Sequence, residues 1–245
     1  MGLGLTFGQL FRINCEGACI EAITPGVKVG GEVTRTIRLS QAAASSKSEA
    51  ASLVAFQKLF SFSAFFFLVL LSFQGSRGRG EGTAFLLGLV LLFFLTAVLA
   101  GPLSRHGLNT RNRFFGKLFE AIHTLRGKPV QFTGLLLLSL GIWLIYPLKL
   151  WLLGRVLVPG LSFLETAAPT FSAYLVALIP IFPGGVGGFE GTLSALLVPA
   201  GFTLGQAVAL ALVFRFITFW LVILGSTLYL LLVPMKGGRV HEKIC

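Results

Sequence analysis

Aspartate is absent from this 245-residue chain, and cysteine and histidine occur only three times each. All nine acidic residues are therefore glutamates. Three cysteines cannot build a disulfide framework, and no histidine stands near the second and third ligands that a metal site needs. The sequence predicts no metal site and no cofactor, and this scarcity of chemically reactive groups argues against most enzyme classes.

Apolar residues, by contrast, make up 55% of the chain, and the mean hydropathy is +0.86. A soluble domain cannot bury that much apolar surface, so we expect an all-α polytopic membrane protein with about five to seven transmembrane helices. The net charge is +11, from 20 Lys and Arg residues against nine glutamates. In a membrane protein this excess indicates cytoplasmic loops and anionic lipid head groups as partners rather than nucleic acid.

Hydropathy divides the chain, as a single integral membrane domain over 1–245, into apolar spans separated by polar intervals. The longest polar interval, 102–129, holds six Lys or Arg residues against one Glu, so the positive-inside rule places it in the cytoplasm. The side of the C-terminus is left open. We expect a partial helix at 3–24, spans at 51–73, 84–101, 130–153 and 163–181, and a last span at 207–234.

The basic interval contains apolar residues at helical spacing, with cations on much of the remaining helix surface. This pattern is typical of a helix lying flat on the inner leaflet, although it also suits a helix that packs on the cytoplasmic side of the protein itself. The basic residues assigned to the membrane surface are Arg111, Arg113, Lys117 and Arg126.

A short motif occurs twice, as TPGVKVGGEVTR at 24–35 and as FPGGVGGFEGTL at the start of 182–203. Aligned on their prolines, the copies agree at five of ten positions: Pro25/Pro183, Gly26/Gly184, Gly30/Gly188, Glu32/Glu190 and Thr34/Thr192. Pro, Gly and Glu are unfavourable in a membrane helix, and irregular backbone survives at that depth only inside protein or around water. The second copy therefore predicts re-entrant half-helices or a broken helix.

The glycines of both motifs have two interpretations. Free N–H groups at a helix start attract anions such as a lipid phosphate, whereas small residues also let membrane helices cross closely. Together with the charged residues nearby, they form a candidate lipid cavity. Its predicted residues are Pro25, Gly26, Gly30, Gly31, Glu32, Arg35, Pro183, Gly184, Gly185, Gly187, Gly188, Glu190 and Arg215.

Glu32 and Glu190 are the charged residues of the two motifs. Each is a candidate for a coupling-proton site, a partner of a nearby arginine, or a charge that favours a helix dipole. Arg215 lies within an apolar run and needs a counter-charge or a phosphate, for which either glutamate is suitable. Lys58 is expected to snorkel to the interface, with the cavity as the alternative.

At these motifs the chain resembles the membrane region of the lysylphosphatidylglycerol synthase/flippase family. The resemblance rests on Pro25-Gly26, Gly30-Gly31-Glu32 and Arg35, on Pro180, Pro183-Gly184-Gly185, Gly187-Gly188 and Glu190, and on Gly201 and Arg215. It implies lipid translocation, or handling of a lipid-linked substrate, in the cytoplasmic membrane of a bacterium or archaeon, with a separate lipid-modifying enzyme as a possible partner.

Three departures from the family pattern qualify this resemblance. The first spans of such proteins are missing or reduced to residues 3–24, and no soluble aminoacyl-transferase domain follows Cys245. Gln57-Lys58 stands where many members carry an acidic-basic pair. The function we expect is a flippase-like activity on a phosphate-bearing lipid. The alternatives are a membrane-embedded transferase for a polyprenyl-phosphate or glycolipid, with Glu32 or Glu190 as general base, and a non-catalytic partner of such an enzyme.

Overall fold

Helices make up all the regular structure in the part of the chain that the computed structural model describes, residues 4–24, 29–75, 129–178 and 185–233. This confirms the predicted fold class. The helices are α1 (Phe7–Ile23), α2 (Val29–Ala42), α3 (Lys47–Gly75), α6 (Pro129–Gly154), α7 (Phe163–Ala177), α8 (Gly188–Leu197), the short turn η2 (Val198–Ala200), α9 (Leu204–Arg215), the π-helical turn η3 (Phe216–Trp220) and α10 (Leu221–Leu232).

Among the described residues, three helices are long and apolar enough to cross a membrane: Lys47–Ser72 in α3, Val130–Gly154 in α6, and Leu204–Leu232. The last combines α9, η3 and α10 into one helix, which we call the 204–232 helix. These three correspond to the predicted spans 51–73, 130–153 and 207–234. The predicted span 84–101 and the basic interval 102–129 lie outside the described residues.

The first motif joins two helices that run antiparallel, α1 and α2, which we call the first hairpin. Gly17 of α1 lies against the Arg35 side chain, and further along α1 Thr24 lies against Gly30. Because residue numbers rise along one helix while they fall along the other, the two helices must run in opposite directions. Glycine at these crossings allows the close approach of the two backbones.

The second motif similarly follows a half-length helix rather than a full span. The predicted span 163–181 is in fact α7, which has 15 residues and a length of about 22 Å at 1.5 Å per residue. That is too short for a hydrocarbon core of about 30 Å. Because α7 packs against the ten-residue α8, the pair forms a second hairpin of two short helices, an arrangement that favours the re-entrant interpretation.

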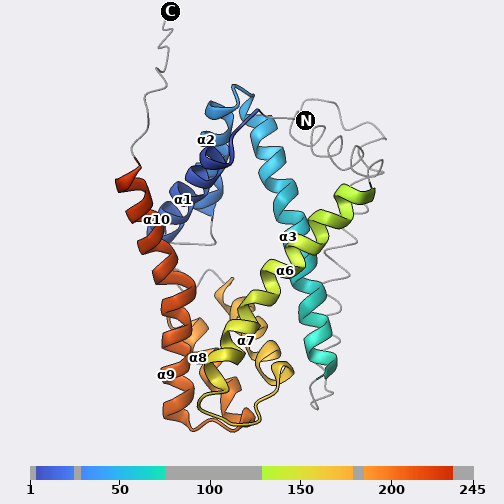
Figure 1. The fold of residues 1–245 in the computed structure, drawn as a ribbon, viewed down its shortest axis with the longest axis vertical. Coiled ribbons are helices and arrows are strands. Elements are labelled where there is room, and N and C mark those ends of the chain that lie inside the picture. The colour runs from blue at the N-terminus through green and yellow to red at the C-terminus, as the bar shows by residue number, and fades with distance from the viewer. Residues whose placement is uncertain (1–3, 25–28, 76–128, 179–184, 234–245) are drawn as a thin grey trace, which may run out of the picture.

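The two hairpins enter the molecule from opposite ends (Figure 1). The first hairpin occupies the upper half of the view and the second the lower half, and both point toward the middle. Each rests on the long helix that follows the other hairpin. Thus α1 packs on α10, and α7 packs on α3.

The same arrangement settles the relative side of the C-terminal helix end. The sequence left it open because the second-motif region could either cross the membrane once or form a re-entrant loop. Since the second hairpin returns to the end it came from, the 204–232 helix crosses back. The end of α10 and the start of α6 consequently lie at the same end of the molecule, together with the start of α1 (Figure 1).

An aromatic cluster joins the second hairpin to the two neighbouring spans. Phe65 of α3 packs 4.5 Å from Trp143 of α6 and 5.8 Å from Phe171 of α7, measured between ring centroids. The Trp143 indole N–H donates to the Ser61 carbonyl oxygen at 2.9 Å. Because such a bond satisfies the polar end of a buried indole, this cluster fixes α6 and α7 on α3.

The close contact in the first hairpin generates a stability prediction. A Cβ atom at Gly31 would lie 2.8 Å from the Gly17 carbonyl oxygen and 2.8 Å from Glu21 Oε2. Overpacking of this kind destabilises by about 1–3 kcal/mol, so Gly31→Ala should lower the thermal melting temperature of the protein in detergent. Gly141→Ala is the matched control, because nothing lies within 4 Å of a Cβ there. An equal effect of the two substitutions would contradict the packing role of Gly31.

Candidate functional site

Arg215, at the end of α9, is the most deeply buried cation of the described residues, with a relative exposure of 6%. Its Nε lies 3.4 Å from Glu190 Oε1, and the Glu190 side chain is only 16% exposed. Glu190 is in the first turn of α8. The pair therefore ties the second hairpin to the 204–232 helix, and it satisfies the need for a counter-charge that the sequence predicted.

Two aromatic rings flank the Arg215 guanidinium. Its Cζ lies 4.9 Å from the centroid of Phe189 and 4.4 Å from that of Phe219. Phe219 belongs to the π-helical turn, directly after Arg215. A desolvated cation on an aromatic face gains roughly 2 kcal/mol, so the rings help to stabilise a charge that water reaches poorly.

The glycines of the second motif shape the backbone around this cation. Gly185 and Gly187 have φ angles of +74° and +84°, a region that residues with a Cβ rarely adopt. A Cβ at Gly185 would lie 3.4 Å from Arg215 Nη2, so the turn passes close to the guanidinium. The Gly187 N–H donates to Glu190 Oε2 at 2.7 Å, which orients the carboxylate at the helix start.

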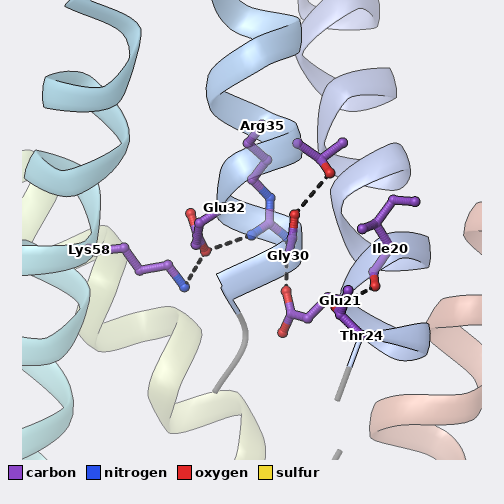
Figure 2. Close-up of polar contacts among 8 residues, drawn as sticks. Ile20, Glu21, Thr24, Gly30, Glu32, Arg35 and Lys58 are labelled. Atoms are coloured by element: carbon purple, nitrogen blue, oxygen red, sulfur yellow. Dashed lines mark hydrogen bonds and ion pairs between the residues drawn. The ribbon is translucent and has the colours of Figure 1, made fainter. Parts of the chain in front are cut away.

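The first motif carries a second charged group, shown in Figure 2. Glu32 Oε1 accepts from Arg35 Nη1 at 2.7 Å and lies 2.6 Å from Lys58 Nζ. Arg35 Nη2 also lies 3.5 Å from Glu21 Oε2. Arg35 thus links α2 to α1, whereas Lys58 links α2 to α3. We call Glu21, Glu32, Arg35 and Lys58 the first ion-pair site, and Glu190 with Arg215 the second.

Gly30 and Gly31 have a packing role in this region. The Thr24 side chain occupies the space where a Cβ of Gly30 would stand, and Gly31 approaches the Gly17 carbonyl oxygen. Both glycines therefore let α2 lie closely on α1. Of the two interpretations from the sequence, the described contacts favour close helix crossing for this pair.

Glu21 is the charged residue of the first ion-pair site that sequence analysis did not assign to a site. Lys58 is 11 residues beyond Lys47, where its span begins, a distance of about 16 Å along the helix at 1.5 Å per residue. Its pairing with Glu32 favours the cavity, the alternative to snorkelling, and the carboxylate in the preceding motif was the available signal.

Tyrosines lie between the two ion-pair sites. The Tyr146 ring of α6 lies 5.0 Å from that of Tyr174 on α7. Tyr174 in turn lies 4.9 Å from Phe189 and is within electrostatic reach of Arg215. The two motifs are thus connected through one layer of aromatic side chains.

The predicted site residues fall into these two groups, with some outside the described part of the chain. Gly30, Gly31, Glu32 and Arg35 belong to the first group, and Gly185, Gly187, Gly188, Glu190 and Arg215 to the second. Within the described ranges no cluster of three potential metal ligands occurs. Pro25, Gly26, Pro183, Gly184, Arg111, Arg113, Lys117 and Arg126 lie outside the described residues.

The structure has apolar spans beside two half-helix hairpins, and charged pairs lie near the middle of the spans. These features define an α-helical integral membrane protein of the polytopic class. The chain belongs to the family described as the lysylphosphatidylglycerol synthase TM region, which matches residues 1–226. The resemblance expected from the two motifs is therefore confirmed.

A protein of the archaeon Methanothermobacter thermautotrophicus, described as a UPF0104 membrane protein, is similar to this chain. The two are 26% identical over 267 residues, an alignment that covers 96% of this chain and 78% of the relative. No solved structure matches the chain.

The burial of the two sites predicts unequal effects on stability. Arg215→Gln would leave a largely buried Glu190 without its cation, which costs roughly 3 kcal/mol. Lys58→Gln should cost less, about 1 kcal/mol, because Arg35 still pairs with Glu32. The measurement is the thermal melting temperature of each variant in detergent, compared with that of the unchanged protein. A double variant with Glu190→Gln and Arg215→Gln should recover part of the loss, and no recovery would argue against the ion pair as the cause.

Proposed function

We propose that this protein moves a phosphate-bearing lipid between the leaflets of the cytoplasmic membrane. The observation that supports the proposal best is the Arg215–Glu190 pair, because a mutually neutralised cation stands near mid-membrane beside a glycine turn. A charged side chain at that depth is unfavourable by at least about 2.5–3.5 kcal/mol, and charges retained there mark substrate or ion pathways.

Arginine is chemically suited to a lipid phosphate. Its planar guanidinium offers two parallel N–H donors to two oxygens of one anion. In the pair with Glu190, the Nε atom of Arg215 contacts the carboxylate. A phosphate that takes the place of the carboxylate would keep the guanidinium neutralised, so the lipid head group could enter without leaving a bare charge in the membrane.

Both hairpins also aim a positive helix end at the middle of the molecule. The second helix of each hairpin begins at a motif, α2 at Val29 and α8 at Gly188. Half-helix N-termini directed at anionic substrate groups near the bilayer midplane are a recurring feature of transporters with discontinuous helices. Glu32 and Glu190 stand in these first turns and act as the internal anions when no lipid is bound.

The charge of the loops supports an orientation. The basic interval 102–129 directly precedes α6, so the positive-inside rule places the start of α6 and the end of α10 on the cytoplasmic side. Arg111, Arg113, Lys117 and Arg126 would then face the anionic inner leaflet. A separate lipid-modifying enzyme working on that side could supply the lipid.

Glu190→Gln tests the proposal in liposomes with the purified protein. The neutral amide no longer balances Arg215, and we expect movement of a head-group-labelled phospholipid to be lost while the protein remains folded. The readout is the rate at which the label becomes accessible to a membrane-impermeant quencher. Glu165→Gln is the matched control, because Glu165 caps α7 through Ser162, far along the chain from both sites, and glutamine can still accept that bond.

Three other results would contradict the proposal or the role that it gives to Glu190. If the wild-type protein moved the label no faster than empty vesicles but turned over a lipid-linked sugar donor, it would be a transferase. If it did neither, a non-catalytic partner role would follow. If Glu190→Gln moved lipid at the wild-type rate, the carboxylate would have no part in the pathway.

A further inference from the structure

The two halves of the described chain have the same order of elements. A half-helix, a Pro-Gly motif and a second half-helix are followed by a long apolar span, first as α1, α2 and α3, then as α7, α8 and the 204–232 helix. The motifs agree at five of ten aligned positions. Because the hairpins enter from opposite ends (Figure 1), the halves are inverted with respect to the membrane.

Packing between the halves repeats in the same inverted sense. The first half-helix of each hairpin lies on the long span of the other half, α1 on α10 and α7 on α3. Aromatic pairs mark both contacts, Phe11 with Tyr229 at 4.9 Å and Phe171 with Phe65 at 5.8 Å between centroids. Such reciprocal contacts are expected from a pseudo-two-fold axis in the membrane plane.

The cations repeat as well. Lys58 is 11 residues beyond Lys47, and Arg215 is 11 residues beyond Leu204, counted from the start of each span. Since the spans run in opposite directions (Figure 1), both cations reach about the same depth from opposite faces, about 16 Å. Each pairs with the motif glutamate in the second half-helix of its own hairpin, Lys58 with Glu32 at 2.6 Å and Arg215 with Glu190 at 3.4 Å.

From this correspondence we propose that residues 7–72 and 163–232 are inverted repeats in which Lys58 is the counterpart of Arg215. In this inference, which rests on the proposed function, a lipid phosphate pairs with the two cations in turn. Each glutamate releases its cation as the phosphate arrives, and its hairpin separates from the adjacent long helix. The hairpins thus open alternately, one toward each side of the membrane.

The ion pairs are placed to control this movement. Lys58 is the cation that joins Glu32 to α3, whereas Arg35 pairs with Glu32 from the same helix and with Glu21 from α1. Loss of the Lys58 pair therefore removes the ionic link between the first hairpin and α3 and leaves the packing of α2 on α3 to hold them together. Glu190 and Arg215 make the equivalent connection between α8 and α9.

Single-cysteine labelling tests the repeat without measuring transport. In a background that lacks Cys15, Cys19 and Cys245, reporter cysteines replace Val33 or Val186, which are 51% and 53% exposed at the protein surface and close to Glu32 and Glu190 in the sequence. Each reporter is treated with a membrane-impermeant maleimide, added to inside-out or right-side-out vesicles.

Lys58→Gln should raise labelling at position 33 only, from the side where the first hairpin enters. Arg215→Gln should raise labelling at position 186 only, from the opposite side. We expect about a fivefold rise in rate for Lys58→Gln, the shift that the loss of about 1 kcal/mol produces, and a larger rise for Arg215→Gln. Arg155→Gln removes a cation on Trp151 instead and should change neither reporter, and Lys58→Arg should restore low labelling at position 33.

Two patterns would overturn the inference. If Lys58→Gln left position 33 unchanged while Arg215→Gln exposed position 186, the halves would not be functionally equivalent. If either variant exposed both reporters, general loosening would explain the result, and melting curves of the same samples would show it. The reciprocal pattern in a protein that moves no lipid would support the repeats and reject the proposed function, so the two failures can be told apart.

Discussion

A cation buried near the middle of a membrane must be neutralised within the protein, and this requirement shapes the whole structure. Arg215 stands in the 204–232 helix, where its own helix offers no carboxylate within the adjacent turns. Another segment must therefore bring a carboxylate to mid-depth. The second hairpin does so because α8 starts there and carries Glu190 in its first turn. A full-length span would have placed its helix ends, and the charges they favour, at the membrane surface.

Short helices at mid-depth create a second requirement, because their ends leave backbone groups without helical partners. The hairpins meet it partly within the motifs, as Glu190 accepts from the Gly187 N–H. Packing does the rest. Neither hairpin is long enough to be stable alone in lipid, and each rests on the long helix of the other half, α1 on α10 and α7 on α3. The reciprocal packing makes the two halves one unit, while side-chain packing and one ion pair join each motif helix to its own long helix.

Sequence reasoning could predict the fold class, three of the spans and the pairing of Arg215 with a motif glutamate, because hydropathy and an isolated charge in an apolar run are local signals. It could not predict the length of α7, because the sequence of Phe163–Ala177 is apolar whether the helix crosses the membrane or stops halfway. Lys58 had two interpretations for a related reason. Near the start of a span, a lysine is expected to snorkel, but the helix begins at Lys47, four residues before the predicted span, and places Lys58 deeper. Such errors depend on helix boundaries and on contacts across the chain, which no local pattern contains.

The two ion-pair sites differ in a way that gives the pathway a polarity. The first contains two carboxylates and two cations, with Lys58 38% exposed and Arg35 20% exposed. The second has one of each, with the Arg215 side chain 7% exposed between two aromatic rings. At the first site Arg35 and Lys58 both neutralise Glu32, so in the proposed pathway a phosphate that takes Lys58 leaves Glu32 paired. At Arg215 the attraction is stronger, but so is the cost of separating it from Glu190. Leu193 occupies the position that corresponds to Arg35, so the second hairpin has no internal cation of this kind to hold its glutamate. In the proposed lipid pathway, an arriving phosphate would therefore compete with Glu190 for a single strong cation, whereas at the first site Arg35 would retain Glu32 while Lys58 is released.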